Sequence, residues 1–296
     1  MSGTTIESQI SSPQATGRCC DLCGGTQFRK RHDWDVGNRW NPATIPIAVW
    51  DCESCQLVTL HPVPTAQQLP DSGDWWSSQR RDMRRRRWFK VRWERIKNSI
   101  FACPVQRLVR QTRKAISHGR LLDVGAGHGP FLDFARSHFD CVALEPSPIA
   151  TKTLRNKGYQ VIESTFEEAD IAPQSFDVVN LDSVIEHVHS PTAVLAKINQ
   201  VLRPGGIVTL KTPKFGGPAY RMHGSEWNGF RHGHHTFLYT GQTLGALLEK
   251  AGFKVLTSPR RDRPLDDILI LWGRKVREVS PQDFAPIDVV TTRAAA

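Results

Sequence analysis

The stretch Leu121-Leu122-Asp123-Val124-Gly125-Ala126-Gly127-His128-Gly129 decides the fold class of this chain. Two apolar residues and an acid lead into three alternating glycines, and apolar residues at helical spacing follow at Phe131, Leu132 and Phe134. This order predicts a buried strand that ends in a tight turn at the edge of a parallel sheet, with a helix after the turn. The glycines leave the backbone open to a ligand, because side chains at these positions would block its approach.

Beyond this stretch, apolar runs alternate with helical or loop segments. The runs that we expect to be strands are 120–124, 141–144, 160–162, 176–181, 206–211, 253–256 and 267–272. Thr240 is expected to cap a helix over 242–251, which Gly252 ends. The alternation predicts an α/β fold, with a mostly parallel seven-stranded sheet and helices on both faces.

Length, apolar runs and cysteine content limit the class of protein. A chain of 296 residues is long enough for one large domain and one small one. It contains no apolar run of about 18 residues, which predicts no membrane span. Its polar first twenty residues lack the apolar core of a secretory signal, so we expect a cytoplasmic protein. In that reducing compartment the seven cysteines should be thiols or metal ligands.

A second acid helps to separate the ligands that a glycine-rich turn could hold. Glu145 ends the strand expected over 141–144 and lies twenty residues beyond Gly125. An acid at that distance points at a ribose and accepts hydrogen bonds from its hydroxyls. A nicotinamide dinucleotide is the alternative ligand. The third glycine, Gly129, comes one residue too early for the dinucleotide pattern G-x-G-x-x-G, which disfavours that alternative.

Five strings in order then carry a family resemblance. They are LLDVGAGHGPFL, ALEPSP, IESTFEEAD, FDVVNLDSVIEHV and LRPGGIVTLKTP, spread over about ninety residues from Leu121 to Pro213. With these strings the chain resembles the class I methyltransferases that use S-adenosylmethionine (SAM). The resemblance implies their Rossmann-like fold and SAM as the methyl donor.

The resemblance also implies roles for single residues. Asp123 would organise the turn and the SAM ammonium, Gly125, Gly127 and Gly129 would admit the methionine part, and Glu145 would bind the ribose hydroxyls. The residues expected around the adenine and the sulfonium are Pro146, Ser147, Thr165, Phe166, Leu181 and Asp182. At Thr165 the family often has an acid for the adenine amino group. Phe166 is expected to stack on the ring.

The segment Asp182-Ser183-Val184-Ile185-Glu186-His187 bears on the acceptor. Methyltransferases acting on exocyclic amino groups often carry N/D-P-P-Y/F here, and this chain has neither the prolines nor the aromatic. Adenine N6 and glutamine methylation are therefore disfavoured. His187 is expected to have a packing or capping role, with a general base as the alternative.

Two Cys-x-x-Cys pairs precede this region. Cys20, Cys23, Cys52 and Cys55 have the residue type and pairing of a tetrahedral, structural Zn site. Cys19 adjoins Cys20, so a swap of ligand between the two stays open. The arrangement resembles, more loosely, the sugar and natural-product tailoring methyltransferases that carry an N-terminal zinc-binding domain.

A histidine-rich segment follows the fifth expected strand. His223, His232, His234 and His235 fall within thirteen residues. Histidine titrates near neutrality, so we expect His234 or His235 to take the acceptor's proton, with His232 as a further candidate. The alternative is that these histidines pack under a lid or bind a metal by chance.

The net charge of +10 is concentrated in one place. Ten Lys and Arg residues lie among the eighteen positions from Arg80 to Lys97. This run is either a solvated amphipathic helix or a surface for an anionic partner such as RNA, a nucleotide-sugar pyrophosphate or a carrier-protein phosphopantetheine.

These observations predict the domain organisation. Residues 1–17 are expected to be disordered, 18–64 to form a zinc-ribbon-like domain, 65–118 a linker with a basic helical segment, 119–278 the SAM-dependent methyltransferase domain, and 279–296 a tail.

They also predict the function. We expect O- or C-methylation of a small biosynthetic intermediate, such as a sugar or natural product. The acceptor could be nucleotide-linked or carrier-bound. RNA methylation and a non-catalytic SAM-binding regulatory role stay as alternatives.

Overall fold

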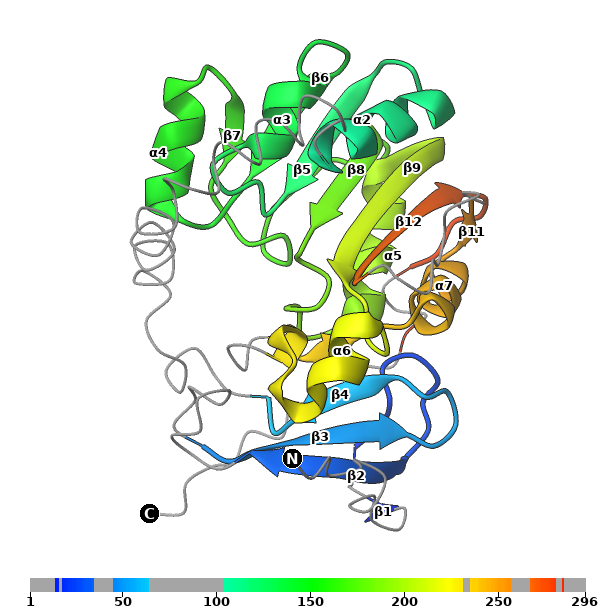
Figure 1. Cartoon of the computed structure of the whole chain (residues 1–296). Coiled ribbons are helices and arrows are strands. Elements are labelled where there is room, and N and C mark those ends of the chain that lie inside the picture. Colours follow the sequence, from blue (N-terminus) through cyan, green and yellow to red (C-terminus); the bar gives the residue numbers. More distant parts are fainter. Residues whose placement is uncertain are drawn as a thin grey trace, which may run out of the picture.

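The computed structural model describes residues 14–15, 18–34, 45–63, 104–230, 235–256, 267–280 and 284. These residues form two β-sheets, a large one and a small one, with the segment around α6 (Pro218–His223) between them (Figure 1). The predictions for residues 1–13 and for the run Arg80–Lys97 lie outside the described residues.

The large sheet has seven strands in the order β11-β12-β9-β8-β5-β6-β7. Their bounds are β5 Arg120–Val124, β6 Asp140–Leu144, β7 Gln160–Ile162, β8 Phe176–Asp182, β9 Leu202–Pro213, β11 Phe253–Val255 and β12 Ile268–Lys275. The five strands from β9 to β7 in this order are parallel, whereas β12 pairs antiparallel with both β9 and β11. The predicted seven-stranded, mostly parallel sheet is confirmed.

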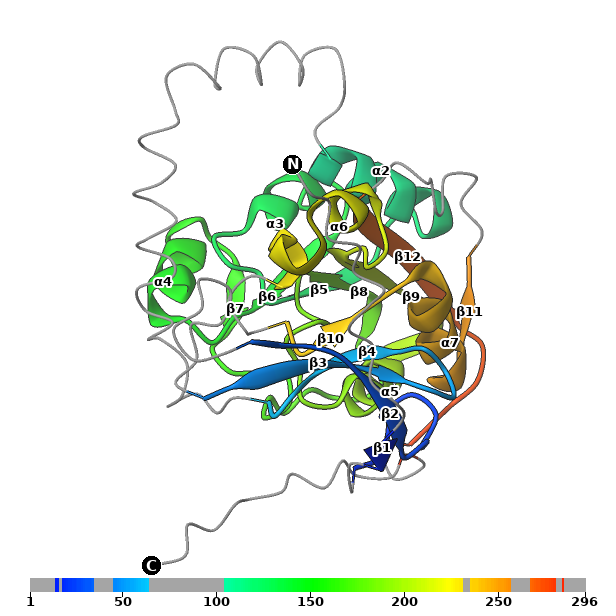
Figure 2. The same ribbon diagram turned by 60° about the horizontal axis from the view of Figure 1, so that its bottom comes forward.

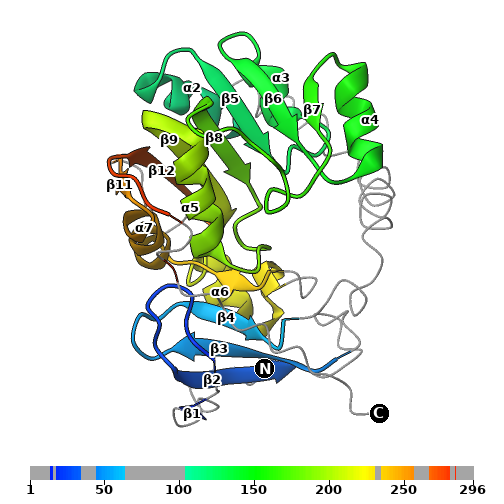
Figure 3. The same ribbon diagram turned by 180° about the vertical axis from the view of Figure 1, so that it is seen from behind.

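Helices cover both faces of this sheet, as the sequence predicts (Figure 3). Their bounds are α2 Pro104–Ala115, α3 Pro130–Ala135, α4 Pro148–Asn156, α5 Pro191–Val201 and α7 Gly241–Lys250. Successive residues of β5 point to opposite faces. Leu121 joins the core under α2, α3 and α4, while Leu122 joins the core under α5 and α7. This double burial explains the continuous apolar runs of the central strands.

The small sheet is antiparallel and has the order β1-β2-β3-β4-β10. Its first four strands are β1 Gln14–Ala15, β2 Gln27–Trp34, β3 Ile47–Cys52 and β4 Val58–His61. The fifth, β10 Phe237–Leu238, comes from far along the chain and pairs with β4 through Phe237↔Thr59 and Leu238↔Val58. The sequence did not indicate this strand. It makes the small sheet continuous with the segment that follows the histidine-rich region (Figure 2).

The small sheet also packs against the segment that follows β9. Phe215, Trp227 and Phe230, which follow β9, pack with apolar residues of the small sheet and of β10, namely Ile47, Val49, Val58, Leu60 and Leu238. Arg31 of β2 donates to the Tyr220 hydroxyl of α6 at 3.2 Å and pairs with Asp51 at 2.8 Å. The small sheet is therefore packed firmly against the segment after β9.

Two residues expected in the tail are buried. Val279 and Phe284 are 6% and 8% exposed and cluster with Ala196 of α5. Isolated apolar residues in a polar stretch carry no periodic signal, so the sequence did not reveal this contact. Within the described part of the chain, each helix is too short or too polar to span a bilayer.

Candidate active site

The glycine turn lies at the carboxyl end of β5, the edge of the large sheet where ligands bind in open α/β folds. Gly125, Gly127 and Gly129 all have positive φ, at 66°, 54° and 81°. A Cβ on Gly125 would lie 2.6 Å from Cγ2 of Val184, in the loop after β8. Glycine is therefore required at Gly125 both by its backbone conformation and by the close approach of that loop.

Asp123 is buried just before this turn, with 2% of its surface exposed. Asn180 of β8 donates to its carboxylate at 2.7 Å. Burial raises the pKa of Asp123 to about 8, and the nearby carboxylates of Asp182 and Glu145 add to that rise. Three acids around one turn suit a cationic ligand, since a positive charge would offset both the burial and the mutual repulsion.

Glu145 directly follows β6 on the other side of the turn and is 4% exposed. Its two carboxylate oxygens accept hydrogen bonds from the backbone amides of Gly127 at 2.8 Å and Ser147 at 2.9 Å. The carboxylate is thus fixed between the glycine turn and the start of α4. Pro146 is exposed beside it. The structure therefore brings Glu145 and the glycine turn together, while the ribose contact stays a prediction.

Thr165 and Phe166 are placed differently from expectation. The Thr165 hydroxyl bonds the side chain of Glu168 at 3.1 Å and accepts from its amide at 3.3 Å, which makes it a local turn cap. Phe166 is 3% exposed and packs in the main core, with the Lys197 ammonium 5.2 Å from its ring centre. A ring buried in this way gives no support to the expected stacking on adenine.

Leu181 and Asp182 end β8 next to β5. Leu181 is fully buried, while the Asp182 carboxylate pairs with the ammonium of Lys211 on β9 at 2.7 and 2.8 Å. Ser183 then has a φ of 61°, and this left-handed residue turns the chain sharply away from the strand. The sequence reasoning missed Lys211 and Asn180, although both are polar residues inside apolar strands.

Three acid–base groups gather in and beside the loop after β8: Glu186, His187 and His235. One ligand atom of each lies within 4.8 Å of those of the other two. The rings of His187 and His235 meet edge to face, with centres 4.6 Å apart. We call these three residues the acid–histidine cluster. His187 was expected to pack or cap, with a base role as the alternative, and the structure places it directly against His235.

The protonation of the cluster follows from its surroundings. Glu186 is fully buried, and this burial raises its pKa to about 8, with the Asp182 carboxylate adding to the rise. Burial therefore favours the protonated form of this carboxyl. Nδ1 of His235 lies 2.6 Å from the carbonyl oxygen of Gly229. A carbonyl only accepts, so Nδ1 carries the proton and Nε2 of the neutral ring is the basic nitrogen. His232 and His234 lie outside the described residues.

The four predicted cysteines converge in the small sheet. Their sulfurs lie within 4.8 Å of one another, with Cys20 3.5 Å from Cys55 and Cys23 3.5 Å from Cys52. We call them the four-cysteine cluster. Cys19 is exposed and not part of it, which decides the alternative between Cys19 and Cys20.

The surroundings of the cluster fit a divalent metal. Tetrahedral Zn with bonds of about 2.3 Å needs sulfurs about 3.8 Å apart. Backbone amides point at the sulfurs, as Gly25 does at 3.4 Å from Cys23. Burial raises the pKa of Cys20 far above its usual range and that of Cys52 to about 11. In the Cys20 case, hydrogen bonding to Cys55 is the larger cause and burial the second. A metal would stabilise the thiolates that this packing otherwise disfavours.

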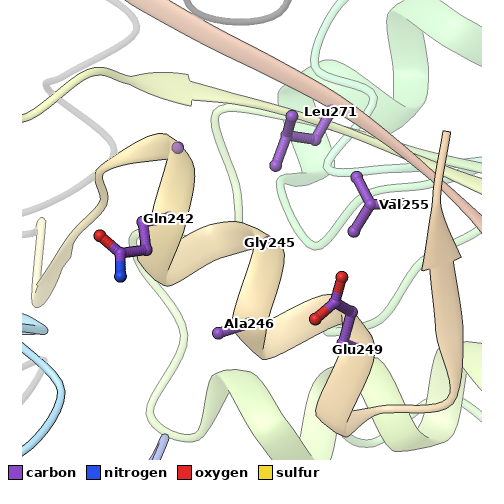
Figure 4. A pocket seen from close by; sticks show the side chains of 7 residues that line it. Gln242, Gly245, Ala246, Glu249, Val255 and Leu271 are labelled. Carbon is purple, nitrogen blue, oxygen red and sulfur yellow. The ribbon is translucent and has the colours of Figure 1, made fainter. Parts of the chain in front are cut away.

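A separate groove of about 390 Å³ lies between α7 and the strands β11 and β12 (Figure 4). Its lining residues are Gly241, Gln242, Gly245, Ala246, Glu249, Val255 and Leu271. None of these belongs to the glycine turn or to the acid–histidine cluster. The groove therefore has no part in the candidate active site.

Comparisons with known proteins agree with this geometry. The protein family described as "Methyltransferase domain" matches residues 93–258, more than half of the chain. A ubiquinone biosynthesis O-methyltransferase of Xanthomonas euvesicatoria pv. vesicatoria is 33% identical over 117 residues, which are 37% of this chain and 49% of the relative. The chain thus spans about half the length of that curated relative.

Two further similarities extend over more of the chain. A ubiquinone biosynthesis O-methyltransferase of Cereibacter sphaeroides is 28% identical over 174 residues, covering 54% of this chain and 70% of the relative. Among solved structures, a chain from the complex between the Haloferax volcanii Trm112 methyltransferase activator and a methyltransferase has a TM-score of 0.51 and 16% identity. It covers 71% of this chain and 100% of that one. This last similarity concerns the fold alone.

Proposed function

This chain belongs to the methyltransferase domain family and is a SAM-dependent methyltransferase, and from that premise we propose that it methylates a hydroxyl or carbon of a small biosynthetic intermediate. The observation that carries the proposal is the acid–histidine cluster in and beside the loop after β8. The relatives named as O-methyltransferases favour a hydroxyl as the acceptor group. A sugar or natural product, nucleotide-linked or carrier-bound, is the acceptor class we propose.

We assign donor binding to the carboxyl edge of β5, β6 and β8. SAM supplies an electrophilic methyl group on a sulfonium. Asp123 would face the positively charged amino-acid end, the glycine turn would admit that end against the backbone, and Glu145 would accept hydrogen bonds from the ribose hydroxyls. Pro146, Leu181 and Asp182 would complete the walls. Thr165 and Phe166 stay as weaker assignments, because the first caps a turn and the second is buried.

We assign acid–base chemistry to the acid–histidine cluster. Nε2 of His235 would accept the acceptor's proton, while the Gly229 carbonyl holds the ring by its Nδ1 proton. The resulting imidazolium would lie beside Glu186, whose side-chain carbonyl oxygen would help to stabilise the charge while the carboxyl keeps its own proton. His187 would help to fix the orientation of the His235 ring through the edge-to-face contact between the two rings. His232 and His234 stay as candidates for the same role.

We further propose that the four-cysteine cluster binds Zn as a structural ion. All four positions of a tetrahedral site are filled by protein sulfurs, so such a metal has no open position for chemistry. We propose the domain boundaries with it: a metal-binding module over 18–64, a linker and basic segment over 65–118, and the methyltransferase domain over 119–278. Helix α2 belongs to the methyltransferase domain as well, because its Leu108 and Val109 pack in the core of the large sheet. Methylation of RNA would draw on the basic run Arg80–Lys97, and a salt-dependent affinity for RNA would promote that alternative.

The test combines donor binding with turnover. Calorimetry on metal-replete protein should detect SAM and S-adenosylhomocysteine, and labelled SAM should methylate members of a panel of hydroxyl and carbon acids. His235→Ala should lose most turnover and keep SAM affinity, whereas His118→Ala, at an exposed histidine, should change neither. Near-full turnover in both His234→Ala and His235→Ala would exclude them as the base. Binding of SAM without transfer to any acceptor, including RNA, would favour a regulatory role.

A further inference from the structure

One acid of the four-cysteine region reaches out of the small sheet. Asp21 lies between Cys20 and Cys23, and its side chain contacts the start of α5 in the large domain. One carboxylate oxygen accepts from the hydroxyls of Ser190 at 2.7 Å and Thr192 at 2.8 Å, and the other accepts from the Thr192 amide at 2.9 Å. The cysteine turn is thereby bonded directly to the first turn of α5.

These bonds complete the N-terminus of the helix. The first amides of a helix have no partner within it. Pro191 has no amide proton, Ser190 accepts from the Ala193 amide at 3.2 Å, and Asp21 takes the Thr192 amide. A carboxylate is also the group that the positive end of the helix dipole favours. Asp21 therefore acts as a capping residue supplied from another part of the chain.

The helix start is the anchor of the acid–histidine cluster. Only three residues separate His187 from Pro191, the first residue of α5. Burial raises the pKa of Tyr239, and the negative charges of Asp21 and Glu186 raise it further. The Tyr239 hydroxyl donates to the carbonyl of Ile185 at 3.1 Å. The Tyr239 hydroxyl therefore holds the residue directly before Glu186.

A second connection joins the small sheet to the same loop. The Thr236 hydroxyl donates to the carbonyls of Glu186 and Val188, each at 3.1 Å. On its other side, Thr236 accepts from the Leu60 amide of β4 at 3.0 Å. His235 directly precedes this residue. The loop that carries Glu186 and His187, and the residue that carries the basic nitrogen, are therefore both held by the small sheet.

The backbone of the cysteine turn is itself fixed to the large domain. The Lys250 ammonium at the end of α7 donates to the carbonyls of Asp21 at 3.2 Å and Leu22 at 2.8 Å. The turn between Cys20 and Cys23 is thus held by the cysteine cluster, by α5 and by α7. Movement of the cysteines would move Asp21 with them.

We propose that Asp21 is a positioning residue, through which the metal-bound cysteine turn holds the loop Ser183–Ser190 and its acid–histidine cluster in place. The consequence for methyl transfer rests on the function proposed above. Metal occupancy then governs the acceptor side of the site and leaves the donor side, formed by β5 and β6, largely unchanged. The structural ion becomes a condition for turnover.

The test compares Asp21→Ala with Asp33→Ala in the full-length, Zn-loaded protein. Asp33 is a matched control, since it lies on β2 of the same sheet with its side chain 61% exposed. Hydrogen exchange should rise at least tenfold in residues 184–193 and 235–240 of Asp21→Ala, and stay within twofold in α4. Zn content and SAM affinity should stay within about twofold of the unchanged protein. Asp33→Ala should behave as the unchanged protein throughout.

Turnover supplies the second readout. Asp21→Ala should lower kcat about tenfold or more, and Asp21→Asn should lie between, because its side-chain oxygen still accepts from the two hydroxyls. If Asp21→Ala fails to fold, Thr192→Val removes one bond from the helix side without touching the cysteine turn and should show the same local rise in exchange. Exchange that is unchanged, or that rises equally in α4, would overturn the proposal. Local loosening in a protein that methylates no acceptor would leave the positioning role standing and refute the proposed function.

Discussion

Replacing Gly125 by alanine tests the reading of the glycine turn most directly. The substitution adds a Cβ to a residue with a φ of 66°, at a point 2.6 Å from Cγ2 of Val184. Gly158, at the end of α4, offers a matched control. It has a similar φ of 82°, and a Cβ there meets nothing within 4 Å. The pair separates the cost of the backbone conformation from the cost of the clash.

The expected magnitudes differ between the two sites. A left-handed conformation costs an L-residue roughly 1–2 kcal/mol, and loss of glycine's freedom in the unfolded chain returns about 0.4–1 kcal/mol. Gly158→Ala should therefore lower the unfolding free energy by about 1 kcal/mol or less. Overpacking against Val184 adds about 1–3 kcal/mol, so Gly125→Ala should lose about 1–4 kcal/mol in total.

The assay is urea unfolding of both single variants and of Gly125→Ala combined with Val184→Ala. The double variant should regain the clash contribution and keep the backbone contribution. SAM calorimetry should show an affinity at least tenfold lower for Gly125→Ala and unchanged for Gly158→Ala. Equal stability losses at Gly125 and Gly158, or strictly additive losses in the double variant, would refute the reasoning.

Three further predictions follow from other parts of the structure. The pKa of Asp123 is raised to about 8, above its value of about 3.9 in the unfolded chain, so its contribution to stability is complete below about pH 4 and is lost as the pH rises to about 8. SAM affinity should rise over the same pH window, because a cationic donor favours the ionised carboxylate of Asp123. Calorimetry from about pH 6 to about pH 9 measures this rise. An equally steep pH profile in Asp123→Asn would contradict the prediction. Trp227→Ala should destabilise the protein by about 3–5 kcal/mol in urea, since the ring is 3% exposed in the core between the small sheet and the segment after β9. A loss below about 1 kcal/mol would show that this core contributes little. Cys20→Ser should lower the bound Zn measured by elemental analysis, whereas Cys19→Ser should leave one ion per chain. Loss of Zn in Cys19→Ser but not in Cys20→Ser would show that Cys19 is the ligand.

Much of the large domain was predictable because its signals are local. The strand over 160–162 and the glycine at position 252 were expected where the structure has them, and Thr240 caps α7 as predicted, accepting from the Thr243 amide at 3.2 Å. Buried parallel strands are continuous apolar runs, and helix ends have capping residues, so both can be read from short windows.

The parts that escaped prediction depend on contacts between distant residues. β10 has two residues, too few for a period, and it exists as a strand only because β4 pairs with it. Asp21 reads as an ordinary acid between two cysteines, and its partners lie about 170 positions away. Phe166 is expected from the resemblance to stack on adenine, yet core packing buries its ring. Such positions are settled by tertiary packing, which sequence windows do not report.

The origin of β10 bears on the synthesis of this chain. At about 5–20 residues per second, a ribosome needs roughly ten to thirty-five seconds to extend the chain from β4 to Phe237. During that interval the outer edge of β4 lacks its native neighbour, and an unpaired edge is open to pairing with other nascent chains. The small sheet is therefore completed late in translation, and a fragment that stops before Phe237 lacks its last strand.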